Sequence, residues 1–193
     1  MNTPTLKTKR LILRKFTPED VESLYLIFKD EDVNTFLPWY PLKNREEAKE
    51  FYEKRYASIY QQKQGYGYAI CLKEDNNPIG YINVSMDEAH DFGYGLSKEY
   101  WHRGIVSEAC KAVIEQVKKD GLPYITATHD KNNPRSGQVM QNIGMKYCYS
   151  YEEQWQPKNF PVIFRMYQLN FDDDQFVYKK YWNESSNHFI ELL

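Results

Sequence analysis

The 193-residue sequence has few cysteines, only Cys71, Cys110 and Cys148. An odd number of widely spaced cysteines fits neither a disulfide framework nor a zinc site, whose ligands come in closely spaced pairs. We therefore interpret the three as small core residues in a reducing compartment, and we expect no metal.

The sequence also lacks an excess of charge of either sign. Its 25 Lys and Arg residues nearly balance 27 Asp and Glu residues, for a net charge of −2. This balance offers no basic field for a nucleic acid and no polybasic patch for a membrane surface. No apolar run approaches the ~20 residues that cross a bilayer, and no hydrophobic signal core stands at the N-terminus. We expect a cytoplasmic protein without nucleic-acid or membrane partners.

What the sequence does contain is segments with the hydrophobic period of a strand interspersed with segments that have the hydrophobic period of a helix. Alternation with a period of two predicts strands near 11–16, 68–72, 79–85, 92–96, 124–128, 147–155 and 162–171. Helical spacing and capping residues predict helices after Thr17, after Asn44, after Gly104 and from Pro134. The predicted architecture is one α+β domain with a meander, a strand–helix–strand crossover and a final hairpin.

The stretch from Trp101 to Ala109 carries the strongest functional signal. A short predicted strand, Phe92 to Leu96, precedes it, and an amphipathic helix follows directly. The first backbone N–H groups of a helix have no partner within the helix and, with the helix dipole, suit a phosphate or pyrophosphate. Gly104 would let the backbone approach such a ligand, and Arg103 would add positive charge. The alternative is that Gly104 only makes a tight connection.

Four stretches together resemble the GNAT superfamily of acyl-CoA-dependent N-acyltransferases, and in particular the branch of ribosomal-protein N-terminal acetyltransferases. They are Thr8–Arg14, Pro78–Ile82, Tyr100–Ala109, and Asn133–Ser136 followed by Ile143–Met145. The resemblance implies a single mixed, mostly antiparallel central sheet of about seven strands with a splayed pair, flanked by about four helices. It covers residues 1–171 as the acyl-CoA N-acyltransferase domain and leaves 172–193 as a C-terminal extension packed on it.

The resemblance also implies acetyl-CoA as co-substrate and a set of residues that hold it. The pyrophosphate would bind the backbone of the turn, while pantetheine would lie between the splayed strands. The matching positions are Tyr94, Leu96, His102, Arg103, Gly104, Ile105, Val106, Ser107, Asn133 and Ser136. Val106 departs from the family pattern, being bulkier than the usual Gly or Ala.

Acetyl transfer to an amine calls for a base, a polarised carbonyl and a stabilised thiolate. Asp91 is our first candidate for the base, with His90 and Glu153 as alternatives. Met140 stands where many relatives carry a tyrosine that acts as the general acid. We therefore select Ser136 as the candidate acid, and Tyr147 and Tyr149 as less favoured alternatives. A mechanism without a dedicated acid is the other option.

The acceptor is the least determined feature of the sequence. By analogy Trp39, Tyr40 and Trp155 would flank its binding site, which could take a peptide N-terminus, an aminoglycoside-like amine or a polyamine. Two other functions stay open, a non-catalytic acyl-CoA-binding or sensor module and a nucleotide-binding regulator; the second lacks a P-loop lysine or a dinucleotide glycine motif. The sequence is compatible with a homodimer.

Overall fold

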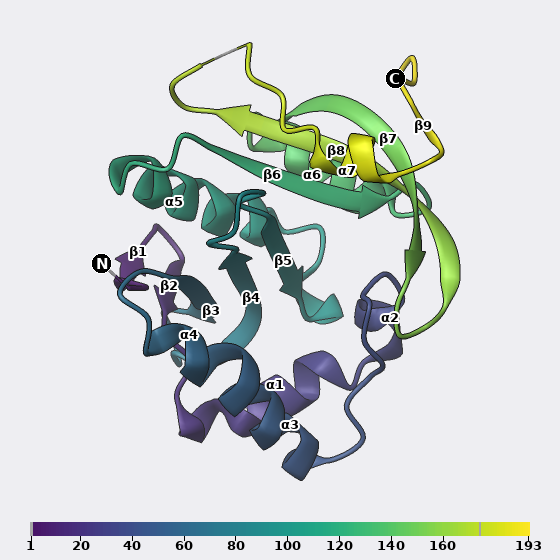
Figure 1. Ribbon diagram of the computed structural model, residues 1–193. Coiled ribbons are helices and arrows are strands. Elements are labelled where there is room, and N and C mark those ends of the chain that lie inside the picture. Colours follow the sequence, from purple (N-terminus) through teal and green to yellow (C-terminus); the bar gives the residue numbers. More distant parts are fainter. Residues whose placement is uncertain (1, 174) are drawn as a thin grey trace.

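The computed structural model describes residues 2–173 and 175–193, and its strands form two antiparallel sheets (Figure 1). The first sheet has the order β1-β2-β3-β4-β5, with β1 (Leu6–Lys7), β2 (Leu11–Arg14), β3 (Tyr66–Leu72), β4 (Pro78–Val84) and β5 (Phe92–Leu96). The second has the order β6-β8-β7-β9, with β6 (Tyr124–Asp130), β7 (Lys146–Trp155), β8 (Phe160–Asn170) and β9 (His188–Phe189).

The helices begin where the sequence offers capping groups. Asn44 accepts a hydrogen bond from the backbone of Glu47, and Pro134 is the first residue of α6. One long helical stretch comprises α3, a π-helical segment η2 and α4, where a single helix is predicted. The bounds are η1 (Pro18–Asp20), α1 (Val21–Phe28), α2 (Glu31–Asn34), α3 (Arg45–Phe51), η2 (Tyr52–Ala57), α4 (Ser58–Tyr60), η3 (Lys98–Tyr100), α5 (Ile105–Lys119), α6 (Pro134–Asn142) and α7 (Lys180–Glu184).

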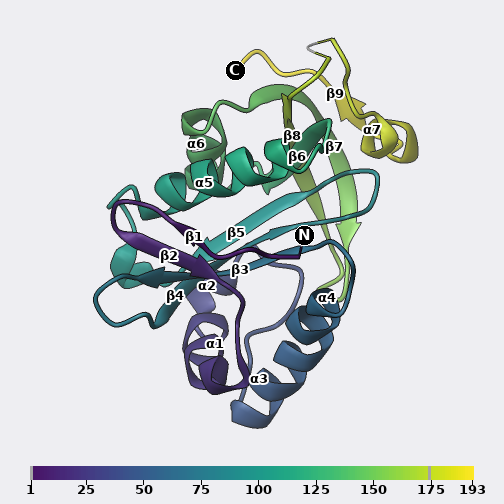
Figure 2. The same ribbon diagram turned by 90° about the vertical axis from the view of Figure 1, so that its left-hand side faces the viewer.

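Helices cover both faces of the first sheet, as Figure 2 shows with α5 above it and α1 and α3 below. On the α5 face, side chains such as Phe92, Leu96 and Ala109 share one core. On the opposite face, Phe28, Tyr56 and Tyr81 belong to a second core. Burying both faces explains why β3 reads as almost continuously apolar and buried, from Tyr66 to Cys71.

The two sheets meet at one point and then diverge. Asp91, directly before β5, forms an isolated parallel bridge with Thr126 of β6, and the Thr126 N–H donates to the His90 carbonyl at 3.3 Å. Beyond this point the two strands separate (Figure 1). The splayed pair is therefore present, and the α+β class is confirmed.

Three details of the expected sheet differ. The splay breaks the hydrogen-bonded ladder, so the strands form two sheets rather than one, and nine strands stand in the described residues where about seven were predicted. The additional strands, β1 and β9, have two residues each, too few to produce an alternating pattern. The helix count of about four is also exceeded, by short helices such as α2 and α7.

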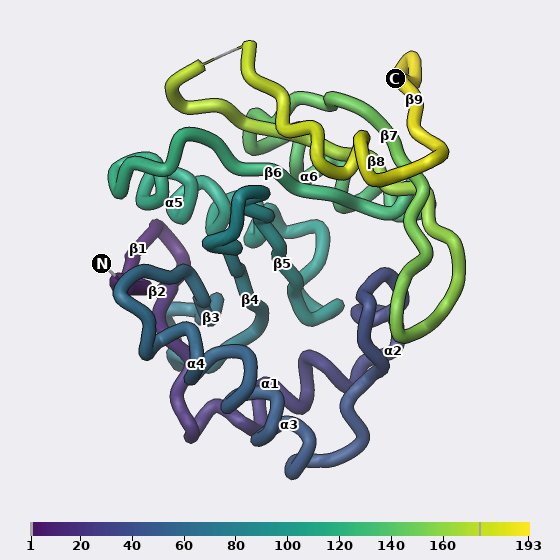
Figure 3. The backbone as a smooth tube through the Cα atoms, viewed as in Figure 1, coloured from purple at the N-terminus to yellow at the C-terminus, as the bar shows by residue number. Residues whose placement is uncertain are grey.

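The C-terminal segment lies against the second sheet, where the yellow end of the tube in Figure 3 runs beside β7 and β8. The strand β9 pairs with β7, with Phe189 opposite Ser150 and His188 opposite Tyr151. In the part of the chain described, no helix combines the length and apolarity needed to cross a membrane.

Candidate functional site

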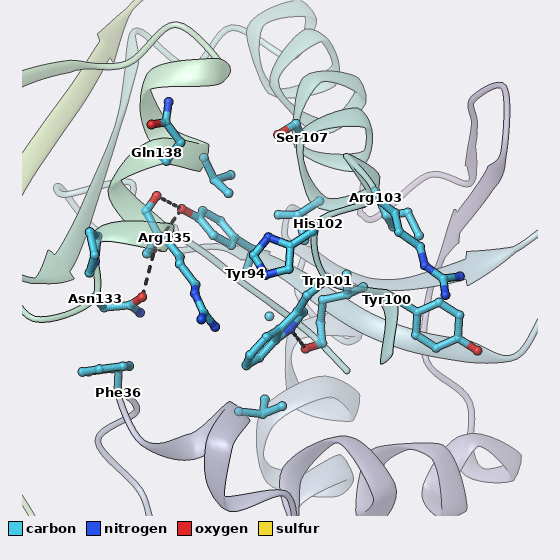
Figure 4. Close-up of a pocket in the computed structure, with 18 of the residues that line it drawn as sticks. Phe36, Tyr94, Tyr100, Trp101, His102, Arg103, Ser107, Asn133, Arg135 and Gln138 are labelled. Atoms are coloured by element: carbon cyan, nitrogen blue, oxygen red, sulfur yellow. Dashed lines mark hydrogen bonds between the residues drawn. The ribbon is translucent and has the colours of Figure 1, made fainter. Parts of the chain in front are cut away.

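A cleft of about 1080 Å³ opens beside β5, between the N-terminus of α5, the start of α6 and the helix α2 (Figure 4). All ten residues predicted to hold a cofactor line it: Tyr94, Leu96, His102, Arg103, Gly104, Ile105, Val106, Ser107, Asn133 and Ser136. Residues up to 42 positions apart in the sequence, Tyr94 and Ser136, therefore contribute to one cavity, because the splay of β5 from β6 leaves room between them.

The turn before α5 exposes the first amides of that helix. Gly104 is the N-cap residue in a left-handed conformation, with φ of 68°, and no side chain caps the helix. His102 also has a positive φ, 61°. The N–H groups that follow Gly104 have no side-chain cap, and their residues line the cleft; an uncapped helix N-terminus is a geometry that can bind anions. Val106, bulkier than the family pattern, lines the cleft without filling it.

Arg10 and Glu108 hold this turn in place. Arg10 donates to the carbonyl of Arg103 at 2.9 Å and pairs with Glu108 at 2.7 Å. Although burial opposes it, hydrogen bonds from Thr8 and Arg10 hold the pKa of Glu108 below its usual value. Glu108 is thus paired with Thr8 and Arg10, and stabilises the helix start.

The backbone of β5 offers hydrogen bonds toward the splay. One hydrogen bond at each end of the β4–β5 pairing shows which residues bond to β4. The Ser85 N–H donates to the Asp91 carbonyl, and the Ser97 N–H donates to the Ile79 carbonyl. The alternation of an antiparallel pair therefore directs the backbone groups of Tyr94 and Leu96 away from β4 and into the cleft. The indole N–H of Trp101 donates to the Leu96 carbonyl at 2.7 Å, which shows that this carbonyl points away from β4.

The opposite wall is the first turn of α6. The Asn133 side-chain oxygen lies 3.4 Å from the Ser136 N–H as the helix cap, which leaves its amide NH₂ group for a ligand. The Tyr94 hydroxyl reaches from β5, donates to the Ser136 carbonyl at 2.8 Å, and lies 3.0 Å from the Ser136 hydroxyl (Figure 4). Burial raises the pKa of Tyr94, so this phenol stays protonated. Sequence reasoning placed only the backbone of Tyr94 here and missed the role of its side chain.

The candidate bases lie outside the lining of the cleft. Asp91 is half-buried at the apex of the splay, where burial raises its pKa to about 6, with the charge of Asp87 adding and that of Arg55 opposing. Glu153 lies on β7, where burial and then Glu184 raise its pKa. The His90 ring packs on Tyr124, with 5.2 Å between centroids.

The candidate acids differ in their freedom to act. Met140 is buried, 1% exposed, in the core of the α5 face. The Tyr149 hydroxyl donates to the Tyr178 carbonyl at 2.7 Å, and the Tyr147 hydroxyl accepts from the Glu191 N–H at 2.9 Å. Both tyrosines are engaged with the C-terminal segment, whereas Ser136 lines the cleft.

The three residues predicted to flank the acceptor do not line this cleft. Trp39 packs under Arg55, whose guanidinium lies 4.6 Å from the ring centroid, and Trp155 packs edge-on against Phe164 at 5.2 Å. Tyr40 is 59% exposed. Of the described residues that line the cleft, none is one of these three. The cleft instead includes Phe36 of the segment after α2 and Arg135 over the Trp101 ring, at 5.3 Å, which the sequence did not single out.

Comparison with known proteins places this geometry among acetyltransferases. Residues 10–146 match the model of the acetyltransferase (GNAT) domain. The chain is 28% identical over 150 residues to YoaA, an uncharacterized N-acetyltransferase of Bacillus subtilis strain 168, covering 74% of this chain and 83% of that protein.

Solved structures with the same fold agree. A GNAT-family acetyltransferase from Bacillus anthracis superimposes with a TM-score of 0.75 and 24% identity, covering 88% of this chain and 100% of that one. RimL, a ribosomal L7/L12 alpha-N-protein acetyltransferase solved in complex with coenzyme A, gives a TM-score of 0.76 at 18% identity, covering 89% and 100%.

Proposed function

This chain belongs to the GNAT acetyltransferase family, and from that premise we propose that it moves the acetyl group of acetyl-CoA directly onto a primary amine in a ternary complex. The observation that carries the proposal is the cleft, which joins the open amides of the α5 start to the outward backbone of β5. One end suits a diphosphate and the other an extended amide chain, and these are the two parts of coenzyme A in the order required.

The residues of the cleft divide the binding of acetyl-CoA among them. The N–H groups from His102 to Ser107 would hold the pyrophosphate, with Arg103 and Arg135 adding positive charge at the mouth. Tyr94 and Leu96 would pair with pantetheine through their backbones, and Asn133 would donate its amide NH₂. Preorganised donors of this kind need no rearrangement when the ligand arrives.

We assign three roles in the reaction to residues of this chain: a base, an acid and a donor to the acetyl oxygen. Asp91 would accept the proton that the ammonium loses, since an ammonium of pKa near 8–10 is largely protonated at neutral pH. As the amine nitrogen bonds the acetyl carbon and the C–S bond breaks, the Ser136 hydroxyl would supply a proton to the departing sulfur and regain one from solvent. The Tyr94 N–H, which points into the splay, is the donor we assign to the acetyl oxygen.

The acceptor class we propose is a protein N-terminus or a small-molecule amine. RimL, whose fold this chain shares, is an alpha-N-protein acetyltransferase. That likeness supports the protein N-terminus without deciding between the two.

The test is to incubate the protein with acetyl-CoA and a panel of peptides and small amines. We expect thiol release that depends on the amine, and mass spectrometry should find a product heavier than the amine by one acetyl group. Tight binding of acetyl-CoA without turnover of any amine would favour the binding module. Preference for ATP over acetyl-CoA in a thermal-shift assay would contradict both.

A further inference from the structure

The two faces of β5 present different side chains to the splay. Phe92, Tyr94 and Leu96 face the core under α5. Because side chains alternate along a strand, Asp91, Gly93 and Gly95 lie on the opposite face, beside their register partners on β4. The residue of β5 that precedes the assigned acetyl-oxygen donor, Tyr94, is therefore a glycine on the face of the proposed base.

On the α5 face, the protein itself closes the inner end of the cleft. The Tyr94 side chain crosses from β5 to α6 and is held there by two contacts with Ser136, at 2.8 and 3.0 Å. Figure 4 shows the ring of Tyr94 spanning this gap. An amine that approaches from this side would have to displace a hydrogen-bonded, half-buried phenol.

On the other face, Gly93 leaves the strand open. A Cβ atom added there would have no atom of the described residues within 4 Å, and the φ of Gly93 lies outside the left-handed region. The neighbouring glycine differs, because a Cβ on Gly95 would lie 2.4 Å from the Tyr81 ring. Packing therefore requires glycine at 95, but neither packing nor backbone conformation requires it at 93.

Two residues with polar side chains are neighbours of Gly93 on this face of the sheet. Asp91 is two residues away on the same face, and Asn83 is the register partner of Gly93 on β4. Both polar atoms of the Asn83 side chain are buried, with no hydrogen-bond partner among the described residues.

We propose that Gly93 is a specificity-determining residue, whose missing side chain admits the acceptor amine over β5 from the face of Asp91 and Asn83. The inference rests on the proposed function and adds to it the route and the width of the acceptor site. In this arrangement acetyl-CoA and the amine reach Tyr94 from different sides of one strand, so both can be bound together.

The test compares wild-type protein with Gly93→Ala and Gly93→Val. The Cβ atom of either variant has no neighbour within 4 Å among the described residues, and valine favours strands over glycine, so the melting temperature should be unchanged or higher. We expect kcat/KM for the best amine of the panel to fall at least about tenfold in Gly93→Val, with Gly93→Ala intermediate, while the Kd for acetyl-CoA stays within about twofold. Hydroxylamine, a much smaller nucleophile, serves as the control acceptor. In both variants kcat/KM should fall less with hydroxylamine than with the larger amine.

Three results would overturn the inference. One is a folded Gly93→Val protein with the wild-type kcat/KM for large amines, and another is a parallel loss of acetyl-CoA affinity, which would assign Gly93 to the coenzyme site. If Gly93→Val does not fold, the Ala variant decides by the same criteria. The third is a wild-type protein that acetylates no amine, which overturns the proposed function itself before any variant is compared.

Discussion

At the scale of single residues, the most consequential environment is that of Asp91. A carboxyl group with a pKa of about 6, against an ordinary 3.8, is poised to exchange a proton near neutrality. The shift comes from burial, with the charge of Asp87 adding to it. A raised pKa improves a base but destabilises the folded protein when the group is ionised, so the two properties can be tested together.

The first prediction concerns activity. Asp91→Asn removes the proposed base without changing side-chain size, so kcat should fall about 10²-fold. The wild-type rate should rise with pH through about 6, as Asp91 loses its proton, and the variant should lack this step. Steady-state kinetics at intervals of about one pH unit between about pH 5 and 9 would measure the pH dependence of kcat for both proteins. An unchanged pH profile in the variant would remove Asp91 from the mechanism, with Glu153→Gln as the next variant to examine.

The second prediction concerns stability at the same residue. The folded-state pKa of Asp91 is raised, so its contribution to folding is most favourable below 3.8 and is lost as the pH rises through about 6. Asp91→Asn should therefore raise the melting temperature above pH 6 relative to wild type, and this gain should shrink toward pH 3.8. Calorimetry at several pH values would reveal the trend, and a variant less stable than wild type above pH 6 would contradict it.

Ser136 and Tyr94 form the other pair that matters at this scale. Ser136→Ala removes the hydroxyl assigned to the leaving sulfur but keeps the backbone N–H that donates to the Asn133 cap of α6, so kcat should fall about 10-fold or more with little change in acetyl-CoA affinity. Ser136→Thr retains a hydroxyl and is the matched control, expected to keep more activity than Ser136→Ala. Equal rates for Ser136→Ala and wild type would leave Ser136 with a structural role.

At the scale of elements, function depends on how α5 begins. Gly104 takes a φ of 68° that non-glycine residues adopt at a cost, and the amides after it stay uncapped. Arg10, directly before β2, links the turn to Glu108 through its hydrogen bonds to Glu108 and to the Arg103 carbonyl. An element boundary, rather than any one side chain, therefore makes the proposed anion site.

The prediction at this scale is loss of the coenzyme without loss of the fold. Gly104→Glu puts a carboxylate where the diphosphate would bind, and acetyl-CoA affinity should fall at least about 100-fold. Gly104→Ala imposes a similar backbone strain, of about 1 kcal/mol, without the charge, and should keep far more affinity. Calorimetric titration would compare the two, and wild-type affinity in Gly104→Glu would refute the site.

At the scale of the whole molecule, the carboxylate of Glu191 adds a charged link between the C-terminal segment and the second sheet, beside the pairing of β9 with β7. Glu191 accepts hydrogen bonds from Arg165 at 2.7 and 3.0 Å and from the Ser150 hydroxyl at 2.6 Å. The Arg165 hydrogen bonds lower the pKa of Glu191 to about 2, although burial opposes the shift. Lys131, which leads into the loop that ends at Asn133, lies 3.5 Å from the same carboxylate. The tail is thereby connected to a wall of the cleft.

The matching prediction is a pH-dependent release of the tail. Because the folded-state pKa of Glu191 is depressed, its stabilisation is present above the ordinary value of 4.5 and is lost as the pH falls toward about 2. Glu191→Gln should destabilise the protein at pH 7 by about 1.5–3 kcal/mol, and the difference from wild type should vanish in acid. Hydrogen exchange of 185–193 would locate the effect. Glu184→Gln, an equal charge change on α7, is the control, and equal destabilisation by both would contradict the assignment.

How much the sequence determined can be judged from particular elements. The resemblance to the GNAT superfamily is confirmed, and the predicted strand 92–96 and the helix after Gly104 match β5 and α5. These features depend on hydrophobic period, capping residues and glycine, which act over a few neighbouring residues and so can be read from order alone. The predicted coenzyme residues belong to the same class, since most of them lie in one continuous turn.

Only the tertiary structure decided what depends on distant segments meeting. The splay that divides the sheet in two, the Tyr94 side chain that reaches Ser136, and the packing of Trp39 under Arg55 join residues 16 to 42 positions apart. The pKa of Asp91 is of the same kind, because burial is a property of everything packed around a group. Local pattern fixed which elements form, whereas burial and contact between elements fixed which side chains face the reaction.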